Sequence, residues 1–135
     1  MHLEELNQWD TIMGLQFENL VHNNLRSIQQ ILNISSSSML SASSYFQKKT
    51  LRKESCQIDL LIQNKHTLYV CEINFRKAIP FSIIEEVSEK IRKLKVEKML
   101  SVRPVLIYQG ELPQKIKDEN FFTHFVFFED LLTKP

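Results

Sequence analysis

Two acidic side chains, Asp59 and Glu72, each lie inside a run of aliphatic and aromatic residues where a lone carboxylate would be costly to desolvate. The polar residues 63–66 between the runs favour a short turn, so the pair of runs predicts a β-hairpin. An even-numbered loop centred on residues 64 and 65 places Asp59 opposite Val70. Glu72 then becomes the diagonal neighbour of Asp59 on the same face, with Cα atoms about 7–8 Å apart.

Two carboxylates at that separation can converge on one cation, and Mg²⁺ or Mn²⁺ prefers carboxylate, carbonyl and water oxygens. Without a cation or base the two charges repel each other and their pKa values rise. An odd-numbered loop would turn one of the strands over and separate the two acids. The alternative is that these strand faces are exposed to solvent, or that Asp59 pairs with an arginine.

The elements that must position these acids follow from hydrophobic periodicity. In chain order they are a helix over 3–32 interrupted near 10–14, a loop or edge strand over 35–44, a strand beginning at 45–47, the hairpin strands 58–62 and 68–75, a helix over 83–100, strands over 105–108 and 121–128, and a helical turn at 129–132. This order predicts an α/β sandwich with a mixed sheet, formed by residues 1–135 as a single domain.

Composition narrows the class of protein. The chain has 135 residues, 43% of them hydrophobic, which suffices for one ordinary core. Its net charge of +1 does not by itself indicate a nucleic-acid partner. The two cysteines form no CxxC motif, which argues against a zinc site and a disulfide framework. No apolar run approaches the ~20 residues of a membrane span, so we expect a cytoplasmic protein without a membrane segment.

Basic residues gather in two places. Lys48, Lys49, Arg52 and Lys53 precede the hairpin, with one acid, Glu54, beside them, and they are the better candidate for DNA phosphate contacts. A second group lies between residues 76 and 98, where Glu–Lys pairs four residues apart favour an ordinary solvated helix face.

A helical acid, an aspartate on one strand and a Glu-x-Lys pattern on the next strand form the arrangement of the PD-(D/E)XK nuclease superfamily. Residues 14–18, 57–61 and 71–77 of this chain resemble its three parts, and the likeness extends over nearly the whole length. The chain more closely resembles the nuclease-like domain at the C-terminus of a family of archaeal and bacterial ATPases.

This resemblance implies a three-layer α/β sandwich with a restriction-endonuclease-like core and Mg²⁺- or Mn²⁺-dependent hydrolysis of DNA. It implies that Asp59, Glu72 and the carbonyl of Ile73 hold the metal, and that Glu18 supports the metal or a bound water. The resemblance also implies an ATPase as a protein partner. Separately, exposed apolar residues on the N-terminal helix, Leu3, Leu6 and Trp9, would favour a protein partner or a homodimer.

The chain departs from the superfamily at Asn74, where the pattern has a lysine that orients the attacking water and offsets phosphate charge. The site then works weakly through the metal alone, or a lysine reaches in from elsewhere, with Lys77, Lys90 and Lys93 as candidates. The remaining alternative is a catalytically inactive nuclease-fold module that binds DNA or protein.

Overall fold

The computed structural model describes residues 19, 21, 23–35, 37–96 and 99–133. The helices are α2 (Leu25–Ile31), α3 (Ile83–Lys93), α4 (Gln114–Asp118) and α5 (Phe128–Thr133), and the strands are β1 (Met39–Gln47), β2 (Cys56–Asn64), β3 (Thr67–Ala78), β4 (Ser101–Glu111) and β5 (His124–Phe127). Most of the helix expected over 3–32 lies outside the described residues, so only its C-terminal part is seen, as α2.

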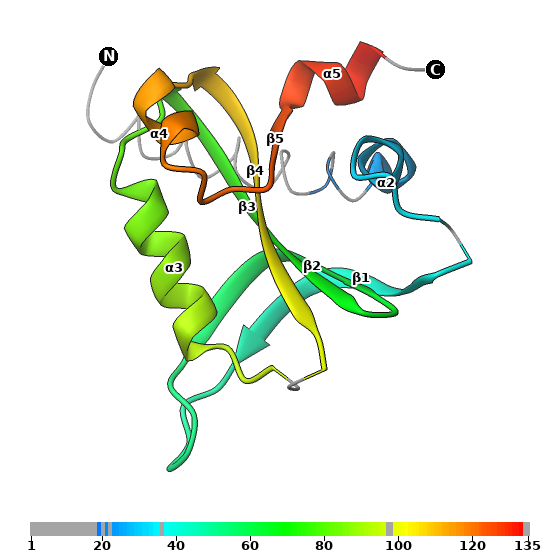
Figure 1. Cartoon of the computed structure of the whole chain (residues 1–135), viewed down its shortest axis with the longest axis vertical. Helices are drawn as coiled ribbons and strands as arrows, with labels where there is room; N and C mark the ends of the chain where they lie inside the picture. The colour runs from blue at the N-terminus through cyan, green and yellow to red at the C-terminus, as the bar shows by residue number, and fades with distance from the viewer. Residues whose placement is uncertain (1–18, 20, 22, 36, 97–98, 134–135) are drawn as a thin grey trace.

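The five strands form one mixed sheet in the order β1-β2-β3-β4-β5 (Figure 1). Strands β1, β2 and β3 are antiparallel neighbours, whereas β3, β4 and β5 run parallel to one another. A parallel pair needs a crossover connection, and α3 provides it between β3 and β4. The expected α/β class with a mixed sheet is therefore confirmed.

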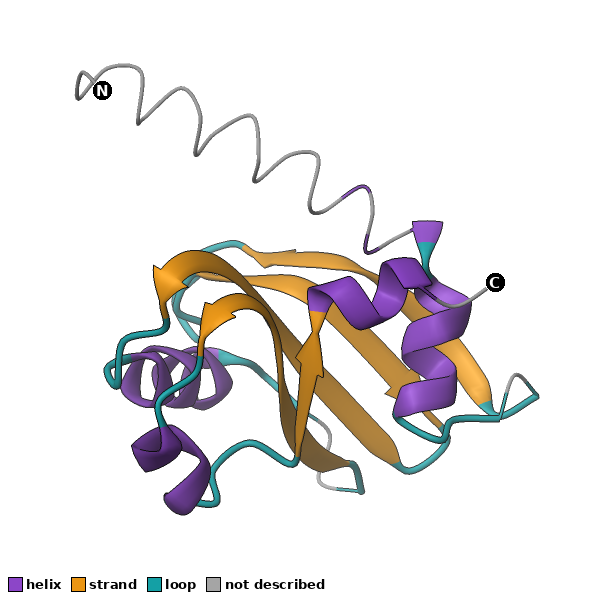
Figure 2. Cartoon of the chain, turned by 90° about the horizontal axis from the view of Figure 1, so that it is seen from above, coloured by secondary structure: helices purple, strands orange, loops and turns teal. Residues whose placement is uncertain are grey.

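The helices cover both faces of the sheet, with α3 and α4 on one side and α2 and α5 on the other (Figure 1; Figure 2 shows the same layers from above). We call the two apolar layers the α2 core and the α3 core. The α2 core consists of Val21, Ile28, Leu32, Ile34, Leu60, Ile62, Tyr69, Cys71, Val105, Ile107, Val126, Phe128 and Leu131. The α3 core consists of Cys56, Ile58, Leu68, Val70, Ile79, Ile83, Val87, Leu94, Leu106, Ile116 and Phe122.

Helix α3 ends at Lys93, so the expectation that it continues to residue 100 is wrong. Leu94 adopts an extended conformation with ψ of 129° and turns into the α3 core. At the helix end the side chain of Gln47 takes over the backbone partners, because it donates to the carbonyl of Lys93 and accepts the N–H of Lys95.

Three other segments differ from the sequence expectation. The residues 39–47 form one edge strand, which ends rather than begins at residues 45–47. Strand β5 is shorter than expected because Asn120 takes a positive φ of 55° and Phe122 packs into the α3 core before the strand begins. The short helix α4 was not expected from the sequence.

The end of β3 is held close to β4 at Gly110. This glycine has a φ of +117°, and an added Cβ would lie 1.8 Å from the carbonyl oxygen of Arg76. Only glycine permits that approach. In the described part of the chain, no helix is long and apolar enough to cross a membrane.

Candidate active site

The hairpin that carries the two acids has a different register from the one expected. Leu61, rather than Asp59, lies opposite Val70, and Leu60 lies opposite Cys71. The loop is thus centred one residue later, and the register is displaced by two residues. Because the displacement is even, the pairing parity is the one expected, and Glu72 comes level with Asp59 instead of diagonal to it.

A β-bulge lies at Asp59. On the β1 side, Ser43 pairs with Leu61 and Tyr45 pairs with Ile58, so Asp59 and Leu60 together face one residue of β1. The bulge changes which face the strand presents, because Ile58 packs in the α3 core and Leu60 in the α2 core. The regular β2–β3 ladder ends at Leu60, immediately beside the acid.

At this point the side chain of Asp59 replaces the backbone of β2 as a hydrogen-bond acceptor. The backbone N–H of Ile73 donates to Oδ2 of Asp59 at 2.9 Å. An uninterrupted antiparallel ladder would place Ile58 at this position, since paired residues exchange both of their backbone bonds. The N–H and C=O groups of a strand residue point toward the same neighbouring strand, so the carbonyl of Ile73 is also directed toward β2.

Glu72 projects from β3 toward α3. Its neighbours Cys71 and Tyr69 pack in the α2 core, so alternation places Glu72 on the other face. Oε2 of Glu72 lies 2.9 Å from Nζ of Lys90, and the side chains of Glu72 and Lys90 are 12% and 29% exposed. Lys90, one of the three lysines considered from the sequence, therefore reaches the candidate site.

The titration of Glu72 reflects its surroundings. Burial, followed by the charge of Asp59, raises the pKa of Glu72 to about 7, although Lys90 acts in the opposite direction. Burial lowers the pKa of Lys90, but the charges of Glu72 and Asp59 and the hydrogen bond to Glu72 outweigh it, so the pKa is raised. Two acids and one ammonium group thus share a partly buried site with one excess negative charge when both acids are ionised.

Asn74 follows two residues after Glu72 on the same strand face. It is 7% exposed, and its Oδ1 is buried with no hydrogen-bond partner in the described part of the chain. A buried amide oxygen without a partner is costly, so this atom calls for a donor or a cation.

The other residues named from the sequence lie farther out or cannot be placed. Lys77 is exposed near the end of β3, and Lys93 is half-buried on α3. Glu18 lies outside the described residues. The prediction that Glu18 joins the site therefore stays a prediction.

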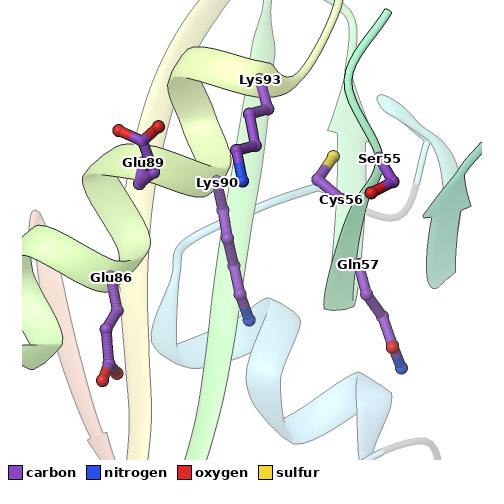
Figure 3. Close-up of a pocket in the computed structure, with 7 residues that line it drawn as sticks. All are labelled: Ser55, Cys56, Gln57, Glu86, Glu89, Lys90 and Lys93. Carbon is purple, nitrogen blue, oxygen red and sulfur yellow. The ribbon is translucent and has the colours of Figure 1, made fainter. Parts of the chain in front are cut away.

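A pocket of about 340 Å³ opens between α3 and the start of β2. Its lining is Ser55, Cys56, Gln57, Glu86, Glu89, Lys90 and Lys93 (Figure 3). In this view Lys90 extends from α3 along the space between the helix and β2. The same lysine binds Glu72, so Lys90 connects the lining of the pocket to the acids.

The donor set suits a hard divalent cation. Asp59 and Glu72 each use one carboxylate oxygen in the described contacts, which leaves the second oxygen of each. Carboxylate and amide oxygens are the protein ligands that Mg²⁺ and Mn²⁺ accept. No group of three His, Cys, Asp or Glu residues arranged for a metal occurs among the described residues, so the protein offers two acids there and water would complete the shell.

Cys71 does not take part in this chemistry. It is fully buried in the α2 core as a free thiol, on the face opposite Glu72. Burial, followed by the charge of Asp59, raises the pKa of the Cys71 thiol. A protonated, inaccessible thiol is not a nucleophile, which agrees with the interpretation of Cys71 as a small core residue.

Comparisons of this chain with protein-family models, with curated proteins and with solved structures found no match.

Proposed function

We propose that this protein is a Mg²⁺- or Mn²⁺-dependent nuclease that hydrolyses phosphodiester bonds of DNA, built on a restriction-endonuclease-like core. The order of elements supports the proposal, because β2 carries the aspartate, β3 carries the glutamate, and α3 follows directly. This is the arrangement of the PD-(D/E)XK superfamily that the sequence resembles.

The observation that carries the proposal is the pairing of Asp59 with Glu72 beside the bulge. The fold holds two carboxylates close enough for Asp59 to raise the pKa of Glu72, in a partly buried site with spare oxygens. Such an arrangement costs stability unless a cation compensates it. Carboxyl groups whose pKa values are perturbed by burial and by a neighbouring charge are characteristic of functional sites.

Each residue has a role in the proposed reaction. Asp59 and Glu72 would hold the metal, together with the carbonyl of Ile73, and the bound metal would supply an activated water and neutralise phosphate charge. Lys90 would offset charge on the scissile phosphate, which is the task of the lysine that Asn74 replaces. Asn74 can orient a water through its amide.

The test combines metal binding and cleavage in the whole chain. We expect Mn²⁺ and Mg²⁺ to bind by isothermal titration, and labelled DNA to be cut in their presence but not with EDTA. Asp59→Asn and Glu72→Gln should each abolish both metal binding and DNA cleavage. Glu85→Gln, which removes an exposed acid from the same helix as Lys90, should leave both unchanged. Equal cleavage by the parent and by Glu72→Gln would contradict the proposal.

The ion pair between Glu72 and Lys90 favours a second candidate, a catalytically inactive module that retains the fold. In that case the ammonium group takes the place of a metal, and the protein serves to bind DNA or a protein such as an ATPase. No binding of either metal at millimolar concentration, in a protein that is folded by circular dichroism, would favour this candidate.

A further inference from the structure

Two segments far apart in the sequence are joined at one end of the molecule by the side chain of Gln47. Its Nε2 donates to the carbonyl of Lys93 at 2.8 Å and to the carbonyl of Glu54 at 2.7 Å. Its Oε1 accepts from the backbone N–H of Lys95 at 3.3 Å. Gln47 is only 3% exposed, so it fixes the loop between β1 and β2 against the C-terminal end of α3.

The loop itself has a defined turn. Oγ1 of Thr50 accepts from the backbone N–H groups of Arg52 and Lys53, and the N–H of Thr50 donates to the carbonyl of Lys53. Figure 1 shows this loop projecting beyond the end of α3. The turn therefore fixes the backbone of the loop, from which Lys48, Lys49, Arg52 and Lys53 are exposed to solvent.

Arg92 forms ion pairs with Glu54 and Glu89, the two acids nearest to this end of the molecule in the described contacts. Its guanidinium lies 2.9 Å from Oε2 of Glu54 and also pairs with Glu89. Six other cations of the loop and of the helix end form no ion pair with any described residue. We call them the basic end: Lys48, Lys49, Arg52, Lys53, Lys93 and Lys95.

The basic end is continuous with the candidate active site. Lys93 belongs to it and also lines the pocket between α3 and β2, where Lys90 is the next lysine along the helix. Lys90 in turn contacts Glu72. Lys93 thus joins the projecting loop to the pocket, whose lining also carries Glu86 and Glu89, and Lys90 joins the pocket to Glu72.

We propose that the basic end is a docking surface for the phosphate backbone of nucleic acid. The partner is identified by charge, because unpaired lysine and arginine side chains displayed along a surface are the usual contacts to successive phosphates. The inference rests on the proposed function in one respect, namely that the docked strand is the substrate of the acid site.

Leu51 adds an apolar contact at the tip of the surface. It is fully exposed between the cations of the loop, where it can pack against a sugar or wedge at a base step. One leucine between four cations also resembles a weak anchor for an anionic membrane. Nucleic acid is favoured because Lys93 lies in a pocket wall that a polyanionic strand can follow and a flat bilayer surface cannot.

The experiment measures binding separately from cleavage. The anisotropy of a short fluorescent DNA duplex is titrated with the whole chain in EDTA, at several salt concentrations. For the parent we expect a steep salt dependence, whose slope falls by about one for each phosphate contact removed. The variant K48Q/K49Q/R52Q/K53Q should bind at least about tenfold more weakly and show a smaller slope.

A control variant removes two cations elsewhere. Lys115 and Lys117 are exposed on α4, and K115Q/K117Q should bind DNA as the parent does. Equal loss of affinity in this control would overturn the proposal, because it would show a general charge effect. Unchanged affinity in the loop variant would overturn it as well.

Two further outcomes separate the possible causes. Tighter binding to vesicles containing phosphatidylserine than to DNA, lost in Leu51→Ser, would overturn the proposal in favour of a membrane. DNA binding that depends on the loop, in a protein that binds no metal and cuts no DNA, would support the docking surface and contradict the nuclease. Metal-dependent cleavage that is unaffected by the loop variant would support the nuclease and contradict the docking surface.

Discussion

The carboxylate of Asp59 accepts the backbone N–H of Ile73, the residue that directly follows Glu72, at 2.9 Å. The carboxyl group of Asp59 therefore supplies the hydrogen-bond acceptor that the bulged strand lacks, and its charge also acts on Glu72. The position of Asp59 is fixed by the backbone of β3, so the two acids stay close together whether or not a cation is bound.

This double role predicts different results for two substitutions. Asp59→Asn retains an oxygen that can accept from Ile73 but removes the charge, so we expect the protein to remain nearly as stable as the parent. Asp59→Ala leaves the N–H of Ile73 without its partner and should lower the free energy of unfolding by about 1–3 kcal/mol. Urea denaturation measures the difference, and equal stability of the two variants would contradict this role for the carboxylate.

Glu72 predicts a pH dependence of stability. Its pKa rises from 4.5 to about 7 on folding, so between these values the folded state binds more protons than the unfolded state. The resulting stabilisation is complete below pH 4.5 and is lost as the pH rises through 7. We expect a loss of about 3 kcal/mol, as an upper value, between pH 4.5 and pH 8 in EDTA.

Glu72→Gln isolates this effect, because it removes the titrating group and keeps the shape of the side chain. The free energy of unfolding of the parent minus that of the variant should become more negative as the pH rises from 5 to 8. A constant difference over that range would mean that the acid is not perturbed by burial and by Asp59.

The ammonium group of Lys90 predicts an exchange experiment. Lys90→Gln should reduce cleavage by about 10²-fold, because the site loses its positive charge and the pKa of Glu72 rises further. A second substitution in that variant, Asn74→Lys, returns a lysine to the same strand face and should restore most of the activity. Asn74→Lys alone should not increase activity, since two ammonium groups would then compete for one site. Single-turnover rates at saturating metal test these expectations, and full activity of Lys90→Gln would assign Lys90 a purely structural role.

Gln47 predicts a local effect at the helix end. Gln47→Glu keeps an acceptor for the N–H of Lys95 but loses the donor to two carbonyls, and it buries a charge. Destabilisation of about 2–4 kcal/mol is expected, with faster hydrogen exchange at the amide of Lys95. Gln47→Met, of similar volume and uncharged, should cost less. Equal hydrogen exchange in all three proteins would show that Gln47 does not hold the loop to α3.

The sequence predicts the α/β class and the side of the strands on which the acids fall, but not their register. Periodicity of two determines parity, so Asp59 and Glu72 keep a common face under any even displacement of the hairpin, and the observed displacement of two residues keeps them close. The exact turn depends on Asn64, which extends β2 instead of joining the turn. Nothing local in the sequence reveals the bulge at Asp59, because bulges depend on both neighbouring strands.

Long-range contacts of polar side chains are the other part that pattern analysis misses. Lys90 is one of several lysines on a helix that looks solvated from its charge spacing, and only the packing of α3 against β3 brings it to Glu72. Gln47 has no signal in the sequence at all, because its partners lie seven and 46 residues away.

Every strand of the sheet lies next to the strand that precedes it in the chain, in the order β1-β2-β3-β4-β5. Successive strands are joined by the loop 48–55, the two-residue turn 65–66, the crossover that contains α3 and the connection that contains α4. Short loops cost little chain entropy, and domains with such local topology fold quickly. During synthesis β1, β2, β3 and α3 precede β4 and β5, so every described residue of the acid site is already present when the last two parallel strands are added.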